Sequence, residues 1–489
     1  MILLHPVFIT AVAVYVLGSF IYRRLSSPVT RLPGPTISKF TGLYLKWNEL
    51  HANRTLYVHS LHETYGPVVR IAPGEVSFTS WAAVKEIYCS SGSGYDKSDF
   101  YDLFKIYGRR TMFTTLDKTN HAKRKRIIAD RYANSNVMRS NSMAGIQERS
   151  ARFVERCKVA TNSTPDIFVT LHAYACDCVT HHLFHPFGTD CLRKSADEEM
   201  MHQVAGDDSL QNRLIEWYAP TIHSLLSQAI HIFYPPRQTP LADDYVLSTA
   251  EKPDPAQFTL LSRLEEKKGA VEGSELDHID VAAECLDHMV AGIDTTGDGL
   301  CFLMWELSQP RSLNFQKKLQ EELRANPGAS LDQLPYLDAV VNEGLRVFPA
   351  IPMSLPRLVP EGGRTIDDVW VPEGTVVSCQ AHSVHRINSH VFPDPDVFDP
   401  ERWLQPEGDT ERRRLLFAFS NGGRGCVGKH LALAEMKTLL RDTYFKFSTT
   451  PDPSMRAESM AMSDQLISSR PLGQRCLLKF HSLDHHESI

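Results

Sequence analysis

The sequence predicts a mainly α fold with minor β sheets, preceded by an N-terminal transmembrane helix. Helical patterns dominate between residues 120 and 350. Short β-like segments occur at 67–79 and 354–383, where turns rich in proline and glycine divide them. Residues 2–22 are almost entirely apolar. The whole chain of 489 residues is long enough for two lobes or one unusually large domain.

Residues 1–24 are predicted to be a membrane anchor. Ile2–Tyr22 is close to the length that spans a bilayer as a helix, no charge precedes it, and Arg23 and Arg24 follow it. A cleavable signal peptide has a shorter apolar core, with its charges in front. Charges behind the apolar run place the body on the cytoplasmic side. The ten cysteines form no CxxC pair, which fits free thiols in the same reducing compartment.

Residues 25–40 are predicted to be a proline-rich linker, and residues 41–489 a single body. Pro28 and Leu32-Pro33-Gly34-Pro35 exclude a continuing helix, so we expect an extended spacer that holds the body off the membrane. The body has no general electrostatic attraction to nucleic acid, because 58 acidic residues outnumber 52 basic ones.

A long helix is predicted from about Glu275 to Leu307, with Ser274 and Asp277 as an N-terminal capping pattern. Its centre, Ala291–Gly299, holds three glycines and two threonines, and each glycine costs about 1 kcal/mol of helix stability relative to alanine. A buried helix with a weak, polar centre indicates a functional site there; a harmless kink is the alternative.

One cysteine lies in a glycine-rich loop, Phe419–Gly428, directly before a predicted helix at Lys429–Tyr444. Glycines let backbone N–H groups approach the sulfur of Cys426, and the start of a helix adds a positive dipole end. Both favour the thiolate, which acts as a nucleophile or as a metal ligand. A purely structural cysteine is the alternative. The rival, Cys476, lies in an apolar strand-like segment without glycines.

The loop matches FxxGxRxCxG at every fixed position, and this pattern resembles the haem-binding signature of the cytochrome P450 family. Four further segments resemble the family in order and spacing: Leu32–Pro35 after the anchor, Ala291–Thr296 (AGxDTT), Glu343–Arg346 (ExxR), and Pro400–Trp403 before the cysteine loop. The resemblance covers nearly the whole chain and implies the cytochrome P450 fold.

The resemblance implies haem b as the cofactor, with Cys426 as the iron ligand, Gly422 in the haem-binding loop and Phe419 packed beside the sulfur. Arg357, Arg424, His121 and Lys125 are the candidate partners of the two haem propionates. The family more often has tryptophan and arginine at positions 121 and 125. A solvated basic face at 121–126 is the alternative for that segment.

Two further groups follow from the resemblance. Glu343 and Arg346 stand three residues apart, so they lie on one helix face and can pair. The family completes this pair with Arg402 in a buried structural triad that retains the haem. Asp294 and Thr295 correspond to the pair that delivers protons during oxygen activation, and Gly292 is expected to leave room for dioxygen beside the helix.

The resemblance implies a membrane-anchored haem-thiolate monooxygenase of the endoplasmic reticulum. It would insert one oxygen atom from O2 into a hydrophobic small molecule. Electrons would come from NADPH through cytochrome P450 reductase, with cytochrome b5 as a possible second partner. The chain is similar to filamentous-fungal members, which often act on secondary metabolites such as polyketides, terpenes or alkaloids. The alternatives are an isomerase, dehydrase or ring-forming oxidase on the same scaffold, and a non-catalytic haem carrier.

Overall fold

The computed structural model describes residues 6–159, 164–206, 209–236, 238–268 and 276–483. The fold is mainly helical with minor β sheets, as predicted. The helices are α1 (Pro6–Ser26), α2 (Leu43–Leu50), α3 (Arg54–Tyr65), α4 (Trp81–Val84), α5 (Lys118–Ile128), α6 (Asn134–Val137), α7 (Ser140–Val159), α8 (Ile167–Phe184), α9 (Ser195–Ala205), α10 (Leu210–Tyr218), α11 (Pro220–Phe233), α12 (Pro240–Ala250), α13 (Leu260–Lys267), α14 (His278–Leu307), α15 (Leu313–Ala325), α16 (Pro335–Val347), α17 (Ala381–Val384), α18 (Asp409–Leu415) and α19 (Lys429–Lys446).

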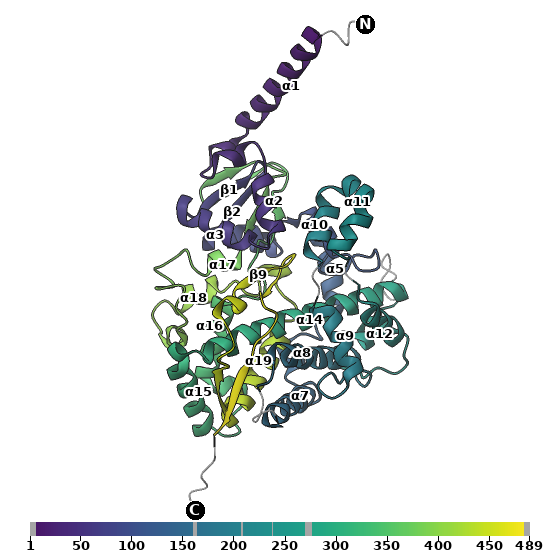
Figure 1. Ribbon diagram of the computed structural model, residues 1–489, viewed down its shortest axis with the longest axis vertical. Coiled ribbons are helices and arrows are strands. Elements are labelled where there is room, and N and C mark those ends of the chain that lie inside the picture. Colours follow the sequence, from purple (N-terminus) through teal and green to yellow (C-terminus); the bar gives the residue numbers. More distant parts are fainter. Residues whose placement is uncertain (1–5, 160–163, 207–208, 237, 269–275, 484–489) are drawn as a thin grey trace, which may run out of the picture.

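The strands form one larger sheet and three two-stranded sheets. The strands are β1 (Val68–Ala72), β2 (Glu75–Phe78), β3 (Asp96–Lys97), β4 (Arg357–Leu358), β5 (Arg364–Ile366), β6 (Val369–Val371), β7 (Val376–Cys379), β8 (Phe447–Pro451), β9 (Met462–Asp464), β10 (Ser469–Pro471) and β11 (Leu478–Ser482). The larger sheet has the order β1-β2-β7-β4-β3, with β2 and β7 parallel in the register Glu75↔Val376. It lies near the base of α1, at the end of the molecule away from α15 (Figure 1).

Helix α14 crosses the helical half of the molecule and packs along α8. It begins with a capping box, in which Asp277 accepts the N–H of Asp280 at 2.8 Å and Asp280 accepts the N–H of Asp277 at 3.2 Å. The predicted start at Ser274 and Glu275 lies outside the described residues. The helix continues through the glycine-rich centre to Leu307 without a break.

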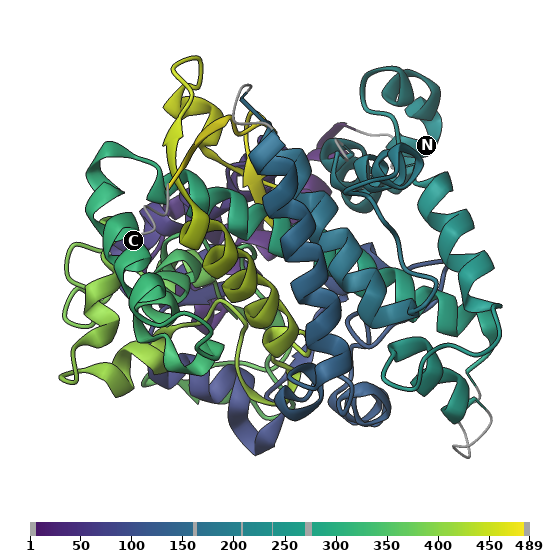
Figure 2. The same ribbon diagram turned by 90° about the horizontal axis from the view of Figure 1, so that it is seen from below.

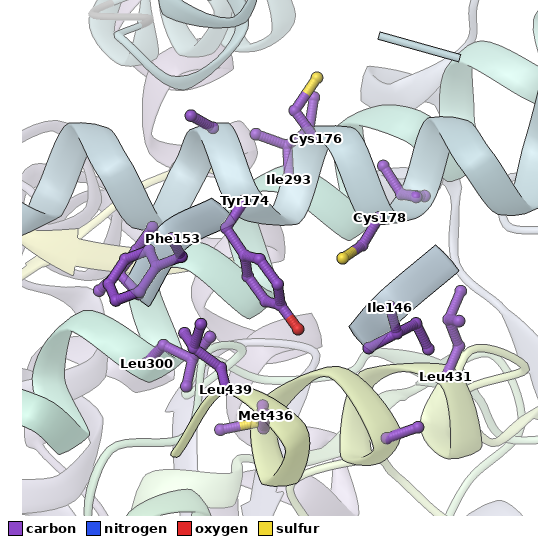
Figure 3. Close-up of a cluster of buried hydrophobic side chains, with 14 of the residues drawn as sticks. Ile146, Phe153, Tyr174, Cys176, Cys178, Ile293, Leu300, Leu431, Met436 and Leu439 are labelled. Carbon is purple, nitrogen blue, oxygen red and sulfur yellow. The ribbon is translucent and has the colours of Figure 1, made fainter. Parts of the chain in front are cut away.

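The main core lies where α7, α8, α14 and α19 meet. Figure 2 shows α19 running beside the blue helices, and Figure 3 shows Phe153, Tyr174 and Leu439 converging from three of these helices. Every residue of α8 is buried except one, so the helix is surrounded by protein on all sides and has no solvent-facing polar stripe. This rigid core fixes the position of α14 and the start of α19.

The segment predicted to be an extended spacer is packed against the sheet instead. Residues Pro28–Arg31 and Thr36–Lys39 form short 3-10 helices. The buried guanidinium of Arg70 on β1 donates to the carbonyls of Thr30, Leu32, Gly34 and Pro35 at 2.6–3.2 Å. Prolines prevent the helix from continuing, so the backbone carbonyls of this segment have no helical N–H partners. They accept hydrogen bonds from the single side chain of Arg70 instead.

Helix α1 projects from the body (Figure 1). Its apolar side chains are exposed on all sides; Val14, Tyr15 and Leu17 have exposed fractions of 65, 75 and 59%. None of the helices in the described ranges is both long and apolar enough to cross a membrane.

Candidate haem-binding and active site

A large cavity separates the middle of α14 from the loop that precedes α19. It contains about 2240 Å³ of space not filled by protein, part of it open to solvent. Asp294 and Thr295 lie on its α14 wall, and Phe419, Arg424 and Cys426 lie on its loop wall. The structure therefore brings the predicted chemical groups together around one space that can hold a large planar cofactor and a second molecule.

Cys426 is the one exposed cysteine of the ten, and its side chain opens into this cavity rather than to the outer surface. Its backbone N–H donates to the carbonyl of Phe419 at 2.9 Å, which fixes the loop. The ring of Phe419 packs on the core beside the cysteine. Cys476, the rival, is fully buried in the core.

Two glycines of the cysteine loop are required by close packing against a neighbouring segment, which is a different reason from the predicted approach of backbone N–H groups to the sulfur. Gly422 has a φ of +72°, and a Cβ there would lie 2.0 Å from the carbonyl oxygen of Tyr88. A Cβ at Gly423 would lie 2.7 Å from the carbonyl oxygen of Gly92. The loop therefore rests on the backbone of residues 88–93, which only glycine permits.

Opposing effects set the pKa of the Cys426 thiol. Desolvation by the surrounding cavity walls raises the pKa of Cys426, whereas the backbone N–H groups of Gly428 and Lys429 and the ammonium of Lys125 lower it. The helix start thus acts on the sulfur in the predicted direction, but desolvation outweighs it. A metal ion at the sulfur deprotonates such a thiol outright, so the donor fits a metal ligand better than a free nucleophile.

Buried basic side chains gather at another part of the cavity wall: His121, Arg357, Arg424 and also Lys97. Sequence reasoning missed Lys97, because it lies in a two-residue strand with no motif around it. Burial and the neighbouring Arg357 and Arg424 hold the pKa of Lys97 well below its usual range. Burial and Arg357 lower the pKa of Arg424 to about 10.

This cluster fits a dianion such as the two propionates of haem. The Nε atoms of Arg357 and Arg424 are buried and have no hydrogen-bond partner among the described residues. An ion pair with Asp96 at 3.3 Å offsets part of the charge of Arg424, and two carboxylates would pair with the like charges that remain. With the open thiol of Cys426, the residues present match haem.

His121 and Lys125 have roles other than a simple positive charge. Burial and the cations around it lower the pKa of His121 to about 3, so its ring is neutral and has one N–H that can donate a hydrogen bond. Lys125 donates to the carbonyls of Gly423 and Gly425 at 2.9 and 3.3 Å. Lys125 therefore stabilises the cysteine loop through hydrogen bonds to its backbone.

Glu343, Arg346 and Arg402 meet in a fully buried network. Arg346 pairs with both oxygens of Glu343 at 2.8 Å, and Arg402 Nε donates to Glu343 at 3.1 Å. The indole N–H of Trp403 and the backbone N–H of Asp399 also donate to this carboxylate, each at 2.9 Å. The network ties α16 to the segment 393–403 that leads toward the cysteine loop.

Close packing against α8 explains two of the glycines in the centre of α14. A Cβ at Gly292 would lie 2.6 Å from Val179 on α8, and one at Gly297 would lie 2.7 Å from His172. Gly292 is thus required by helix packing, which is a different reason from the predicted room for dioxygen. The hydroxyl of Thr295, which donates to the carbonyl of Ala291 at 2.6 Å, lies on the cavity wall with Asp294.

Two buried acidic groups near this wall were not foreseen from the sequence. Burial raises the pKa of Glu435 on α19 to about 8, and its carboxyl lies 3.4 Å from the hydroxyl of Thr296. Asp298 lies 3.5 Å from Nε2 of His172. Neither stands in a motif that marks it as functional.

The model of the family described as "Cytochrome P450" matches residues 32–477. The chain belongs to the cytochrome P450 family. It is 30% identical over 474 residues to the cytochrome P450 monooxygenase stcB of Emericella nidulans, covering 92% of this chain and 88% of the relative. It is 27% identical to the cytochrome P450 monooxygenase orf2 of Aspergillus niger, covering 95% of each. It is 29% identical to the conidiogenone synthase PchP450 of Penicillium rubens, covering 88% of this chain and 90% of the relative.

Membership in the cytochrome P450 family accounts for the open thiol and the cation cluster, because the family is built around a haem held by a cysteine thiolate. The family also makes the chain an oxidoreductase of the monooxygenase type.

Replacing Glu343 by glutamine should lower the free energy of unfolding by about 3–5 kcal/mol, because two buried guanidinium groups lose their counter-charge. We expect the purified variant to have much less haem per chain as well. Chemical denaturation and haem content measure the two effects.

Glu321→Gln is the matched control, because Glu321 is 60% exposed and lies 3.9 Å from Lys317. We expect it to change stability by less than about 1 kcal/mol. Equal effects of the two substitutions would contradict a structural role for the Glu343 network.

Proposed function

We propose that this chain is a membrane-anchored monooxygenase that inserts one oxygen atom from O2 into a hydrophobic small molecule. The observation that supports this most directly is the placement of the Cys426 thiol and the Asp294–Thr295 pair on walls of one cavity. When bound, the haem supplies the activation of dioxygen and the transfer of its oxygen atom.

The residues of the chain would divide the work as follows. Cys426 holds the iron, and Arg357 and Arg424 bind the propionates together with Lys97 and the N–H of His121. Thr295 Oγ1 would hold a proton near the oxygen-binding space, and Asp294, the preceding residue of the helix, would resupply it. Glu343, Arg346 and Arg402 keep the loop in place without touching the substrate.

A substitution of Thr295 distinguishes monooxygenation from isomerase, dehydrase and oxygen-independent chemistry. Thr295→Ala should lower product formed per NADPH by at least about tenfold and release hydrogen peroxide, because positioned proton transfer contributes about 10²–10⁴-fold. Product analysis with a peroxide assay measures the coupling.

Thr295→Ser, which keeps the hydroxyl, should restore most of the coupling. If Thr295→Ala leaves product yield unchanged, proton delivery by this hydroxyl is wrong and an isomerase or dehydrase is favoured.

The relatives support a fungal secondary metabolite as the substrate. All three come from fungi; two are named cytochrome P450 monooxygenases, and the third is by its name a synthase of conidiogenone. We infer a polyketide, terpene or alkaloid scaffold, because the cavity is lined mainly by apolar and aromatic side chains, among them Phe104, Phe113, Val290 and Ile351.

Electrons would come from NADPH through cytochrome P450 reductase, with cytochrome b5 as a second donor. We place the docking face around the cysteine loop, where Lys429 is exposed and lies 5.8 Å from the ring centroid of Phe419. A basic face suits an acidic partner.

Lys429→Glu should slow reduction by the reductase, and the effect should be largest at low ionic strength. Reduction by dithionite serves as the control, because it needs no docking. Stopped-flow rates that are slowed equally with both reductants would point to an altered haem site, and unchanged rates with the reductase would exclude this docking face.

We also propose that residues 1–24 anchor the chain in the endoplasmic reticulum membrane, with residues 25–40 as the connection and 41–489 as a cytoplasmic catalytic domain. The exposed apolar side chains of α1 support this proposal. Exposed apolar groups on α11 (Ile222, Leu225, Phe233) and near α2 (Leu43, Tyr44, Trp47) give the body a second apolar surface that a bilayer could cover.

Val14→Arg combined with Leu17→Arg should make the protein extractable from membranes by alkaline carbonate, because each central charge costs about 2.5–3.5 kcal/mol on insertion. Leu472→Arg, at a position 60% exposed on the body, should leave the protein in the pellet. A wild-type chain that carbonate releases would contradict the anchor.

A further inference from the structure

A tyrosine, a histidine and a glutamate stand in line at the wall of the cavity, and the chemistry proposed above uses none of them. Tyr132, in the turn after α5, and His288, on α14, both line the cavity. The hydroxyl of Tyr132 lies 2.5 Å from Nδ1 of His288. Glu284, one turn earlier on α14, lies 3.3 Å from Nε2 of the same ring. All three side chains are buried, so little water competes for these contacts.

Glu284 sets the direction of hydrogen bonding along this chain of groups. Both of its oxygens accept the N–H of Met112 at 3.0 Å, and the guanidinium of Arg124 lies 3.6 Å away. A carboxylate next to a guanidinium accepts hydrogen bonds, so it favours the histidine tautomer with the proton on Nε2. Nδ1 of His288 is then the acceptor, and Tyr132 donates its phenolic proton to it. This is the order in which a carboxylate and an imidazole together draw a proton from a hydroxyl.

Loss of the phenolic proton alone is unfavourable at this position. Burial raises the pKa of Tyr132 well above its usual value, so the phenol stays protonated. Removal of an electron changes this, because an oxidised phenol is a strong acid that gives its proton to a base within hydrogen-bond distance. His288 is such a base, and Glu284 would balance the charge of the imidazolium. Tyr132 can therefore lose an electron and a proton together without leaving an isolated charge in the interior.

A second histidine ring packs against Tyr132 and is neutral. The ring centroids of His182, on α8, and Tyr132 are 4.6 Å apart. Burial lowers the pKa of His182 to about 3, so this imidazole carries no charge at neutral pH. A cation at this position would oppose the removal of an electron from the phenol, and the neutral ring does not.

Tyr101 lines the same cavity but has a different partner. Its hydroxyl accepts a hydrogen bond from Nη1 of Arg357 at 2.8 Å. A guanidinium has no site that takes up a proton, and its positive charge opposes the removal of an electron from the ring. Of these two tyrosines, Tyr132 is therefore the one with a base for its proton.

We propose that Tyr132 is a redox-active tyrosine, which gives one electron to the oxidised haem while its phenolic proton moves to His288. The O–H bond of Tyr132 breaks, an N–H bond forms at Nδ1, and the haem gains the electron. The phenol is restored when the same proton returns together with an electron that NADPH supplies through the reductase and the haem. The step gives oxidising equivalents an outlet when no substrate lies in the cavity. The inference rests on the proposed function, because the reaction with O2 supplies the oxidised haem.

Freeze-quench electron paramagnetic resonance of the substrate-free holoenzyme tests this inference. A peracid, m-chloroperbenzoic acid, oxidises the haem without O2 or NADPH and is itself reduced to the carboxylic acid. We expect a tyrosyl radical in the wild-type protein, with a hyperfine pattern that changes when the tyrosine rings are deuterated. Labelling of histidine with ¹⁵N should also change the hyperfine couplings, because the radical of Tyr132 is hydrogen-bonded to His288. This measurement needs no variant to fold.

Three substitutions assign the radical to its site. Tyr132→Phe keeps the ring but removes the hydroxyl, and it should abolish the signal. His288→Gln keeps a hydrogen-bond acceptor but removes the base, and it should lower the radical yield by at least about tenfold, because positioned proton transfer contributes about 10²–10⁴-fold. Tyr101→Phe is the matched control at the cavity wall and should keep the signal.

The outcomes separate this inference from the proposed function. A wild-type protein without a tyrosyl radical, a radical without coupling to histidine nitrogen, or a radical that survives in Tyr132→Phe would overturn the role of Tyr132. An unchanged yield in His288→Gln would overturn the transfer of the proton to that ring. Such results in a protein that shows the thiolate-specific carbon monoxide band leave the monooxygenase proposal intact, and absence of that band from the wild-type protein overturns both.

Discussion

A single buried carboxylate, that of Glu343, determines where the cysteine loop can lie. It accepts hydrogen bonds from Arg346, Arg402, Trp403 and the backbone of Asp399, so α16 and the segment before the loop are joined at one point. Arg346 and Arg402 in turn donate to carbonyls of residues 385–397. Burying this network is costly, and so is removing one of its members. We therefore expect the cysteine loop either to keep this geometry or to lose it as a whole.

The cavity has a basic region that matches an anionic cofactor. The guanidinium groups of Arg357 and Arg424 lie there beside the ring of His121, where haem propionates would pair with them. The Cys426 thiol and the Thr295 hydroxyl line the same cavity. Burial strengthens the interactions of charged groups in this space, because little water is present to screen them.

Much of this site could be predicted from the sequence, because its residues stand in short motifs with fixed spacing. The positions of Cys426, Glu343 with Arg346, and Asp294 with Thr295 follow from such patterns, and the mainly helical fold follows from periodicity. Contacts between distant segments could not be predicted in this way. Lys97 joins the cation cluster through a two-residue strand, Arg70 gathers the proline-rich segment onto the sheet, and Gly292 is needed because Val179 packs against it.

The account depends on a bond between the sulfur of Cys426 and a haem iron. The most direct measurement is the absorption spectrum of the purified, reduced protein after addition of carbon monoxide. The account predicts the Soret band specific to a thiolate ligand in the wild-type protein and loss of that band in Cys426→Ser, with Cys476→Ser unaffected. A wild-type protein without this band, or a Cys426→Ser variant that keeps it, would contradict the account.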